Sequence, residues 1–185
     1  MKELTDDRVY KYLEEKYDEL LLDYILLEAN GAYAGEETHR EAVIEAIACM
    51  GSRTRVGNRC DFDVFTVEKD KMRCQKVDVD DFFFEGNNGW WLSPEEVGVK
   101  ASADRMNYWH AFLDPPYGIP YTVENFRQIN HMLFPGSPKD LEIYSWNDEF
   151  SDYFDDGKEW WGTAMWSVYD KNLKRFVVIG ASLTD

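Results

Sequence analysis

The stretch Trp160–Gly180, WWGTAMWSVYDKNLKRFVVIG, decides the fold class of this chain. Residues Trp160–Tyr169 are mostly aromatic, β-branched or small, and Phe176–Ile179 is an unbroken apolar run. Both compositions are typical of strands. The polar segment Lys171–Lys174 between them has the character of a tight turn. We therefore predict two antiparallel strands joined by a short connection.

The segment before this pair extends the same pattern. Side chains alternate in character over residues 141–146, which predicts a third strand. The run Asp155-Asp156-Gly157-Lys158 then has the composition of a turn that leads into the strand from Trp160. The β-rich region, residues 140–183, is therefore expected to form an antiparallel β-meander.

The N-terminal third has helical periodicity instead. Thr5, followed by two aspartates, has the features of an N-cap, and apolar residues continue at helical spacing to about Glu28. A second helix is predicted over Glu36–Met50, which has an apolar face and is followed by Gly51. We expect residues 5–50 to form a helical pair. The apolar residues of the first helix are Val9, Leu13, Tyr17, Leu20, Leu21 and Tyr24.

The middle of the chain, residues 59–135, is expected to mix strands, helices and loops. Alternating residues 62–66 and the segment Cys74–Val79 predict a β-hairpin within residues 59–84. Cap and proline signals predict further helices from Ser93, over Ser102–Leu113, and from a Thr122 cap to Leu133.

Length and composition favour one α+β domain over residues 1–185. The chain has 185 residues, of which 44% are hydrophobic and 16% aromatic, enough to bury a core. It contains three cysteines in no recognisable pattern, which favours free thiols. No apolar run approaches the roughly 20 residues that cross a bilayer, and the N-terminus lacks a secretion signal. We therefore expect a cytoplasmic protein.

Charge is the strongest functional clue in the sequence. The chain has 36 acidic and 20 basic residues, a formal net charge of −16. The excess lies in two blocks, because residues 1–45 have 13 acids and 5 bases, and residues 140–159 have 8 acids and 1 base. Such a field repels nucleic acid and membranes and attracts basic protein surfaces within a Debye length of about 8–10 Å. We therefore expect a basic protein as partner and no direct binding of nucleic acid.

The two acidic blocks supply the candidate contact residues. On the predicted first helix, stacked carboxylates are expected to form a negative ridge with spacing of about 5–7 Å, close to that of duplex phosphates. The late block, residues 140–159, mixes acids with aromatic residues, a composition that suits an interface to which charge steers the partner. The same patterns also fit a solvated helix face and an acidic loop. The candidate residues are Glu14, Glu15, Asp18, Glu19, Asp23, Asp148, Glu149, Asp152, Tyr153, Asp155 and Asp156.

No motif in the sequence predicts catalysis, a metal site or a cofactor. The three histidines lack a partner histidine at ligand spacing, and no nucleophile elbow or phosphate loop is present. Two alternative functions stay open. One is a small enzyme that uses His110, His131 and neighbouring Cys or Asp residues. The other is a sugar- or cation-binding module that uses Trp90, Trp91, Trp160 or Trp161.

The C-terminal segment carries one resemblance. Residues 159–185, EWWGTAMWSVYDKNLKRFVVIGASLTD, with residues 144–157, YSWNDEFSDYFDDG, resemble a group of uncharacterised bacterial proteins, some carried on mobile elements. This resemblance assigns no chemistry. By its acidic character the chain is similar to anti-CRISPR and anti-restriction inhibitors, which occupy the DNA-binding grooves of nucleases. The similarity implies a non-catalytic inhibitor that binds a nuclease such as a Cas effector, or alternatively an immunity protein that neutralises a toxin.

Overall fold

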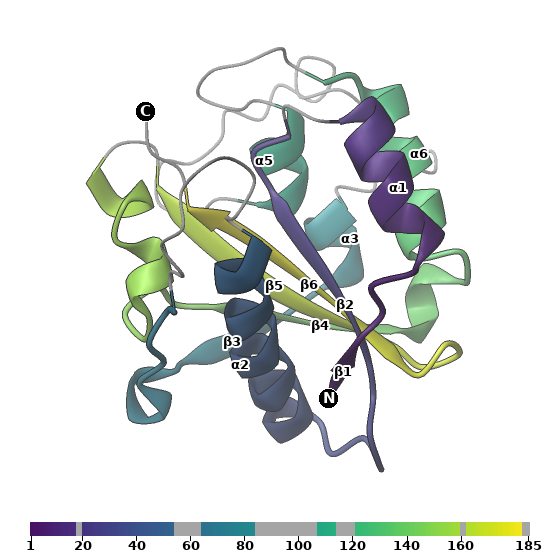
Figure 1. Cartoon of the computed structure of the whole chain (residues 1–185). Helices are drawn as coiled ribbons and strands as arrows, with labels where there is room; N and C mark the ends of the chain where they lie inside the picture. The colour runs from purple at the N-terminus through teal and green to yellow at the C-terminus, as the bar shows by residue number, and fades with distance from the viewer. Residues whose placement is uncertain (18–19, 54–63, 84–106, 114–120, 160–161, 183–185) are drawn as a thin grey trace.

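A computed structural model describes residues 1–17, 20–53, 64–83, 107–113, 121–159 and 162–182. These residues form an antiparallel sheet of six strands in the order β1-β2-β6-β5-β4-β3, with helices on both faces, so the fold is α+β (Figure 1). The strands are β1 (Lys2–Glu3), β2 (Asp23–Glu28), β3 (Cys74–Val77), β4 (Leu141–Trp146), β5 (Thr163–Asp170) and β6 (Arg175–Ser182).

The predicted meander forms the centre of the sheet. Strands β4, β5 and β6 are sequential antiparallel neighbours, and the register of the β5–β6 hairpin pairs Asp170 with Arg175. The Asp170 carboxylate accepts hydrogen bonds from the backbone N–H groups of Asn172 and Leu173, at 2.9 and 3.0 Å. This side-chain turn fixes where β5 ends and β6 begins. The meander is therefore confirmed, whereas Trp160 and Trp161 lie outside the described residues.

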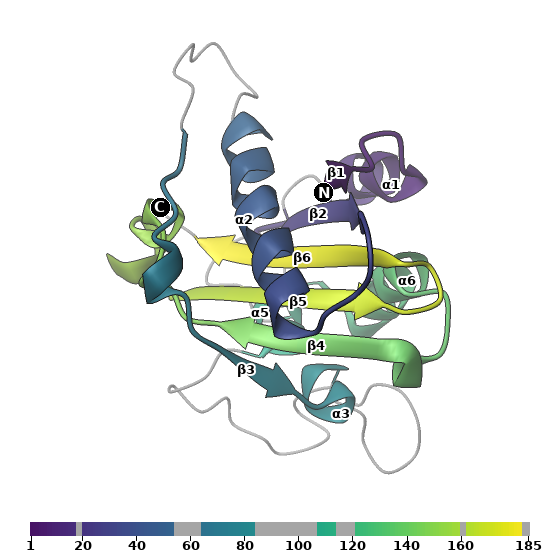
Figure 2. The same ribbon diagram turned by 90° about the horizontal axis from the view of Figure 1, so that it is seen from below.

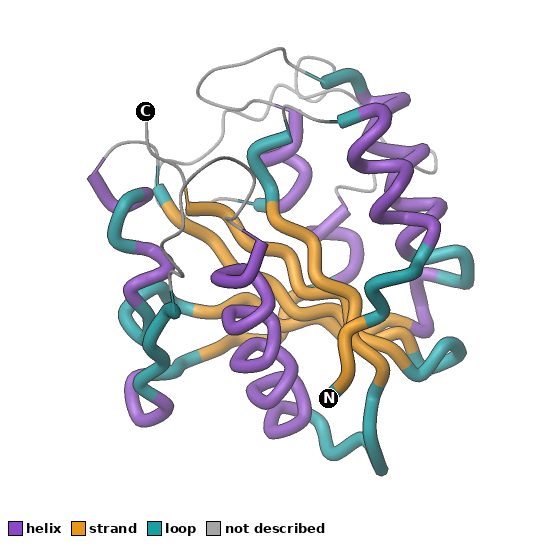
Figure 3. The backbone as a smooth tube through the Cα atoms, in the orientation of Figure 1, coloured by secondary structure: helices purple, strands orange, loops and turns teal. Residues whose placement is uncertain are grey.

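Helices cover the two faces of the sheet unequally. Figure 2 shows α2 (Glu36–Arg53) on the near face, and Figure 3 shows the strands as one twisted layer with helices on both sides. The opposite face packs against α1 (Arg8–Lys16), α3 (Val79–Phe83), α5 (Tyr108–Leu113) and α6 (Val123–Leu133). Each face has its own apolar cluster, which explains why β5 and β6 are buried along almost their whole length.

The first predicted helix is wrong in its second half. Helix α1 starts after an Asp7 cap, two residues later than expected, and ends at Lys16. The segment expected to continue it contains β2. The apolar run Tyr24–Leu27 is buried on both faces of the sheet, a pattern of four residues that a buried strand and a helix share. Antiparallel pairing with β6 makes this run a strand rather than a helix.

The predicted hairpin in the middle of the chain is also wrong. Strand β3 pairs with β4, and residues 64–66 form no strand. Near the expected first arm, Val67 makes an isolated bridge to Ser151. After β3 the chain forms α3, which buries Phe82 and Phe83 in the core. A half-exposed strand of four residues carries no sequence signal for its partner, because pairing is set by neighbours distant in sequence.

Other predicted elements hold where the structure describes them. Helix α2 begins at the predicted Glu36 and runs three residues past Met50. Helix α6 has the predicted Thr122 cap in a reciprocal capping box. Helix α5 occupies the end of the predicted helix that finishes at Leu113. The expected helix from Ser93 lies outside the described residues. Short 3-10 helices cover Lys69–Lys71, Pro138–Asp140, Asp152–Phe154 and Gly157–Glu159.

Arg175, the first residue of β6, ties two helix ends to the sheet. Its guanidinium lies 3.1 Å from Asp7, the residue that caps α1 through a 2.9 Å bond from the Val9 N–H. It also donates to the carbonyls of Met132 and Leu133 at the end of α6. Both charged side chains are largely buried, 12% and 19% exposed. One cation therefore fixes α1 and α6 relative to the hairpin.

We expect Arg175→Met to lower the free energy of unfolding by about 2–4 kcal/mol, because it leaves the Asp7 carboxylate and the α6 carbonyls without their donor. Urea denaturation measures this loss. Lys139→Met removes the same charge from an exposed side chain and should change stability by less than about 0.5 kcal/mol. Equal effects of the two substitutions would contradict the structural role of Arg175.

Candidate functional site

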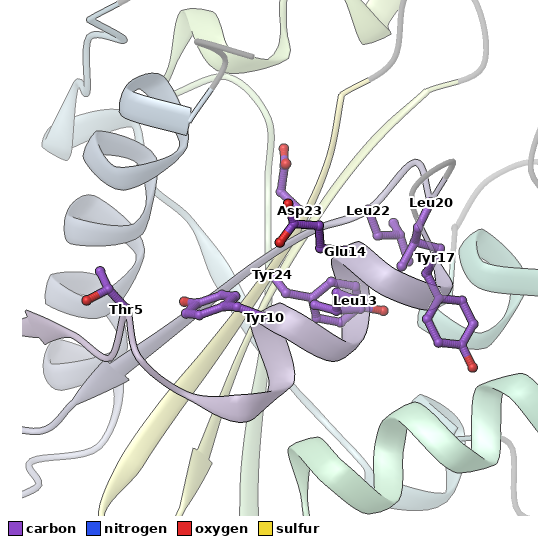
Figure 4. A pocket seen from close by; sticks show the side chains of 9 residues that line it. All are labelled: Thr5, Tyr10, Leu13, Glu14, Tyr17, Leu20, Leu22, Asp23 and Tyr24. Atoms are coloured by element: carbon purple, nitrogen blue, oxygen red, sulfur yellow. The ribbon is translucent and has the colours of Figure 1, made fainter.

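An open pocket of about 310 Å³ lies between α1 and the start of β2 (Figure 4). Helix α1 contributes residues spaced by three and four positions, which lie on one face of a helix. The loop that leads into β2 and the first residues of that strand form the other wall. The lining residues are Thr5, Tyr10, Leu13, Glu14, Tyr17, Leu20, Leu22, Asp23 and Tyr24.

The pocket exists because β1 is short. This strand has two residues and pairs with β2 only at Leu27 and Glu28. One residue earlier, the Tyr10 hydroxyl accepts a 2.7 Å hydrogen bond from the Leu26 N–H, and Leu4 donates to the Leu26 carbonyl. At the start of β2, near Asp23, the neighbouring element is therefore α1 rather than another strand. A helix cannot pack against the side of a strand as closely as a paired strand does, which leaves the pocket.

Below the pocket, a buried chain of hydroxyl groups holds the first residues of β2 in place. The Tyr24 and Tyr108 hydroxyls lie 2.9 Å apart, and Tyr108 donates to Asn130 Oδ1 at 3.1 Å. Asn130 in turn donates to the Phe126 carbonyl within α6. Burial raises the pKa of both tyrosines, so the phenols stay neutral. This chain supports the pocket and offers no base for catalysis.

The pocket has two of the predicted contact residues. Glu14 is exposed, and no hydrogen bond or ion pair within the described residues engages its carboxylate. The neighbouring Glu15 is also exposed but pairs with Lys11 at 3.6 Å. Asp23 accepts a 2.8 Å hydrogen bond from the Tyr153 hydroxyl. Asp18 and Glu19 lie outside the described residues.

The Tyr153–Asp23 hydrogen bond joins the two acidic blocks at one end of the sheet. Tyr153 belongs to the 3-10 helix of the late block, 130 residues away from Asp23 in sequence. Burial, and then the Asp23 charge, raise the pKa of Tyr153, which keeps its proton available to the carboxylate. The predicted helical ridge is not formed, since α1 ends at Lys16 and Asp23 lies in β2. The tertiary fold brings the blocks together in its place.

The late block divides into acids with a local role and acids that face solvent. Asp148 accepts from the Thr163 hydroxyl at 2.5 Å, and Asp152 accepts from the Thr66 N–H at 2.7 Å. Glu149, Asp155 and Asp156 are exposed, and Asp155 pairs with Lys158 at 3.3 Å.

The aromatic residues of the late block were expected at an interface, and this expectation is wrong for their rings. Phe150 and Phe154 are 0% exposed and Tyr153 is 6% exposed. All three belong to the apolar cluster on the α2 face. Their burial anchors the acidic segment to the sheet, and only its carboxylates remain available to a partner.

Gly180 makes the contact between Tyr153 and Asp23 possible. It lies opposite Asp23 in the β2–β6 register. A Cβ atom at this position would meet the Tyr153 hydroxyl at 2.5 Å and the Met50 methyl group at 3.0 Å. A glycine that ends an apolar strand run is a sequence signal for close approach of another group, and it was missed in the sequence.

Gly180→Ala should displace Tyr153 and lower the free energy of unfolding by about 1–3 kcal/mol, because the added methyl group overpacks the site. Chemical denaturation of the variant checks this value. In a Tyr153→Phe background the nearest clashing atom is absent, so the same substitution should cost less. An equal cost in both backgrounds would contradict the proposed contact.

A second polar network, on the α2 face, contains a serine–histidine pair. His39 Nδ1 lies 2.8 Å from Ser167 Oγ, and Trp146 Nε1 donates to the same oxygen at 2.8 Å. His39 Nε2 lies 3.0 Å from the Tyr33 hydroxyl, so both ring nitrogens have a hydrogen-bond partner. His39 and Ser167 are both 0% exposed, so substrate has no access to this pair. The network is structural.

Burial lowers the pKa of His39 from 6.5 to about 3. Between these values the unfolded chain binds a proton that the folded chain does not. The free energy of unfolding should therefore rise with pH up to about 6.5, by about 1.4 kcal/mol per pH unit from this group, and the contribution should end above that pH. Urea denaturation of the protein and of His39→Gln across this range isolates the effect. An NMR titration in which the His39 ring becomes protonated near pH 6 would contradict it.

The residues of the alternative functions are not assembled into a site by the described residues. His110 is half-buried in α5, and His131 is exposed on α6. Burial raises the pKa of Cys74 to about 11, which leaves an unreactive thiol at neutral pH. Where the chain is described, no three His, Cys, Asp or Glu side chains group as metal ligands would. Cys60, Trp90 and Trp91 lie outside these residues.

Comparison with known proteins gave no match to a family model, a curated protein or a solved structure. Among the helices of the described ranges, none has both the length and the apolar character needed to cross a membrane.

Proposed function

We propose that this protein is a non-catalytic inhibitor that binds a basic groove of another protein through its two acidic blocks. The Tyr153–Asp23 hydrogen bond supports this proposal, because it connects blocks that are far apart in the sequence. A net charge of −16 produces a field that attracts a basic surface over a distance of about a Debye length. A basic groove is the surface that such a field attracts and orients.

The partner is proposed to be a protein that processes nucleic acid, such as a nuclease of the Cas type. The channel of such a nuclease attracts the negative phosphates of nucleic acid. Exposed carboxylates such as Glu15, Asp155 and Asp156 carry the same sign of charge as those phosphates. The buried aromatic rings of the late block leave electrostatics as the main source of attraction. Binding is therefore expected to weaken as salt shortens the Debye length below about 8 Å.

The test reverses exposed charges whose only ion pairs within the described residues are exposed ones between residues close in sequence, Glu15 with Lys11 and Asp155 with Lys158. Glu15→Lys, Asp155→Lys and Asp156→Lys together should abolish binding to the basic partner and leave the melting temperature almost unchanged, since these side chains are exposed. Partners are captured from a bacterial lysate at low and high salt, and a recovered nuclease is assayed for DNA binding and cleavage.

The matched control makes the same change in net charge on other elements. Glu41 on α2 and Asp80 and Asp81 on α3 are exposed, and their reversal to Lys should leave binding intact. Loss of binding in both triple variants would indicate a nonspecific effect of net charge. Retained binding in the first triple variant would overturn the proposed interface. A recovered toxin without affinity for DNA would favour the immunity-protein alternative.

A further inference from the structure

The pocket between α1 and β2 has features that a purely acidic surface does not need. Its volume of about 310 Å³ lies at the lower end of the range of ligand pockets, about 300–1,000 Å³, and suits a single long side chain. Leu13, Leu20 and Leu22 contribute apolar side chains to a lining that also holds Thr5, three tyrosines and two carboxylates. A fully hydrated ion gains nothing from the leucines, whereas a charged group on an apolar stem does.

Glu14 and Asp23 supply the negative charge of this pocket, and Asp23 already accepts from the Tyr153 hydroxyl. The spacing of Glu14 from Tyr10, Leu13 and Tyr17 places it on the side of α1 that lines the pocket, in a row of otherwise apolar or aromatic residues. Lys11, three residues before Glu14 on α1, pairs with Glu15 instead.

The two ends of the pocket are preorganised by tyrosines. The Tyr10 hydroxyl accepts from the Leu26 N–H and donates to Glu3 at 3.1 Å, so the ring cannot swing away without loss of both bonds. The Tyr17 hydroxyl donates to the Asn125 carbonyl at 3.3 Å, and its ring packs against Phe112. Walls that are fixed before binding reduce the entropy lost on association.

We infer that this pocket receives an arginine side chain from the basic partner. The guanidinium pairs with the Glu14 carboxylate, and the aliphatic stem lies against Leu13, Leu20 and Leu22. Arginine suits the pocket better than lysine, because its planar cation is less strongly hydrated and stacks on aromatic faces. This inference rests on the proposed function and adds a defined anchor to it.

The test uses the full chain and two short peptides of one sequence, acetyl-Gly-Ser-Arg-Ser-Gly-amide and its citrulline analogue. Citrulline keeps the shape of arginine without its charge. In NMR titrations at millimolar peptide, the arginine peptide should shift the amide signals of Leu13, Glu14 and Leu22, and the citrulline peptide should bind about tenfold more weakly.

Two glutamate variants locate the charge. Glu14→Gln should weaken binding of the arginine peptide about tenfold, whereas Glu41→Gln, at an exposed position on α2, should leave it unchanged. Three results would each overturn the inference: no binding of the arginine peptide, equal binding of the citrulline analogue, or no effect of Glu14→Gln.

The inference and the proposed function fail separately. If Glu14→Gln leaves peptide and partner binding unchanged while reversal of Glu15, Asp155 and Asp156 abolishes partner binding, the acidic interface stands and the arginine pocket fails. If the arginine peptide needs Glu14 while the triple reversal leaves partner binding unchanged, the pocket stands and the proposed acidic interface fails.

Discussion

The positions of α1 and α6 on the sheet depend on the ion pair between Arg175 and Asp7. The arginine begins β6, and the turn before it is fixed by the Asp170 carboxylate. The aspartate caps α1, and the same guanidinium binds the last carbonyls of α6. A charge this far from water needs partners for stability, and its Nη atoms find them on α1 and α6, so the hairpin, α1 and α6 are placed together. The pocket beside β2 follows from where α1 is held.

The candidate site combines two constraints on the same strand. The short β1 leaves the start of β2 beside α1, and Gly180 leaves room for Tyr153 to reach Asp23 from the other face. The first constraint produces a pocket, and the second joins Tyr153 of the late acidic block to Asp23, one of the residues that line it. Neither arrangement needs a special side chain at the surface. Both result from how closely backbone and rings approach at one end of the sheet.

Most groups that resemble catalytic machinery are part of the framework. The His39–Ser167 pair and the Tyr24–Tyr108 chain have the distances of functional networks, but both are buried beneath helices. Their hydrogen bonds satisfy polar atoms within a core that is rich in aromatic rings. The surface that remains is defined by charge and by the pocket, which is why the proposed function is binding rather than catalysis.

The sequence by itself determined the elements whose signals are local. The apolar strands of the meander, helix α2 and the Thr122 cap of α6 were predicted because periodicity and capping act within a few residues. The acidic residues proposed to contact a partner were also visible as charge blocks. Only the tertiary structure decided that the run Tyr24–Leu27 is a strand and that β3 pairs with β4. It alone brought Tyr153 to Asp23, since each of these contacts joins segments distant in sequence and no local preference encodes it.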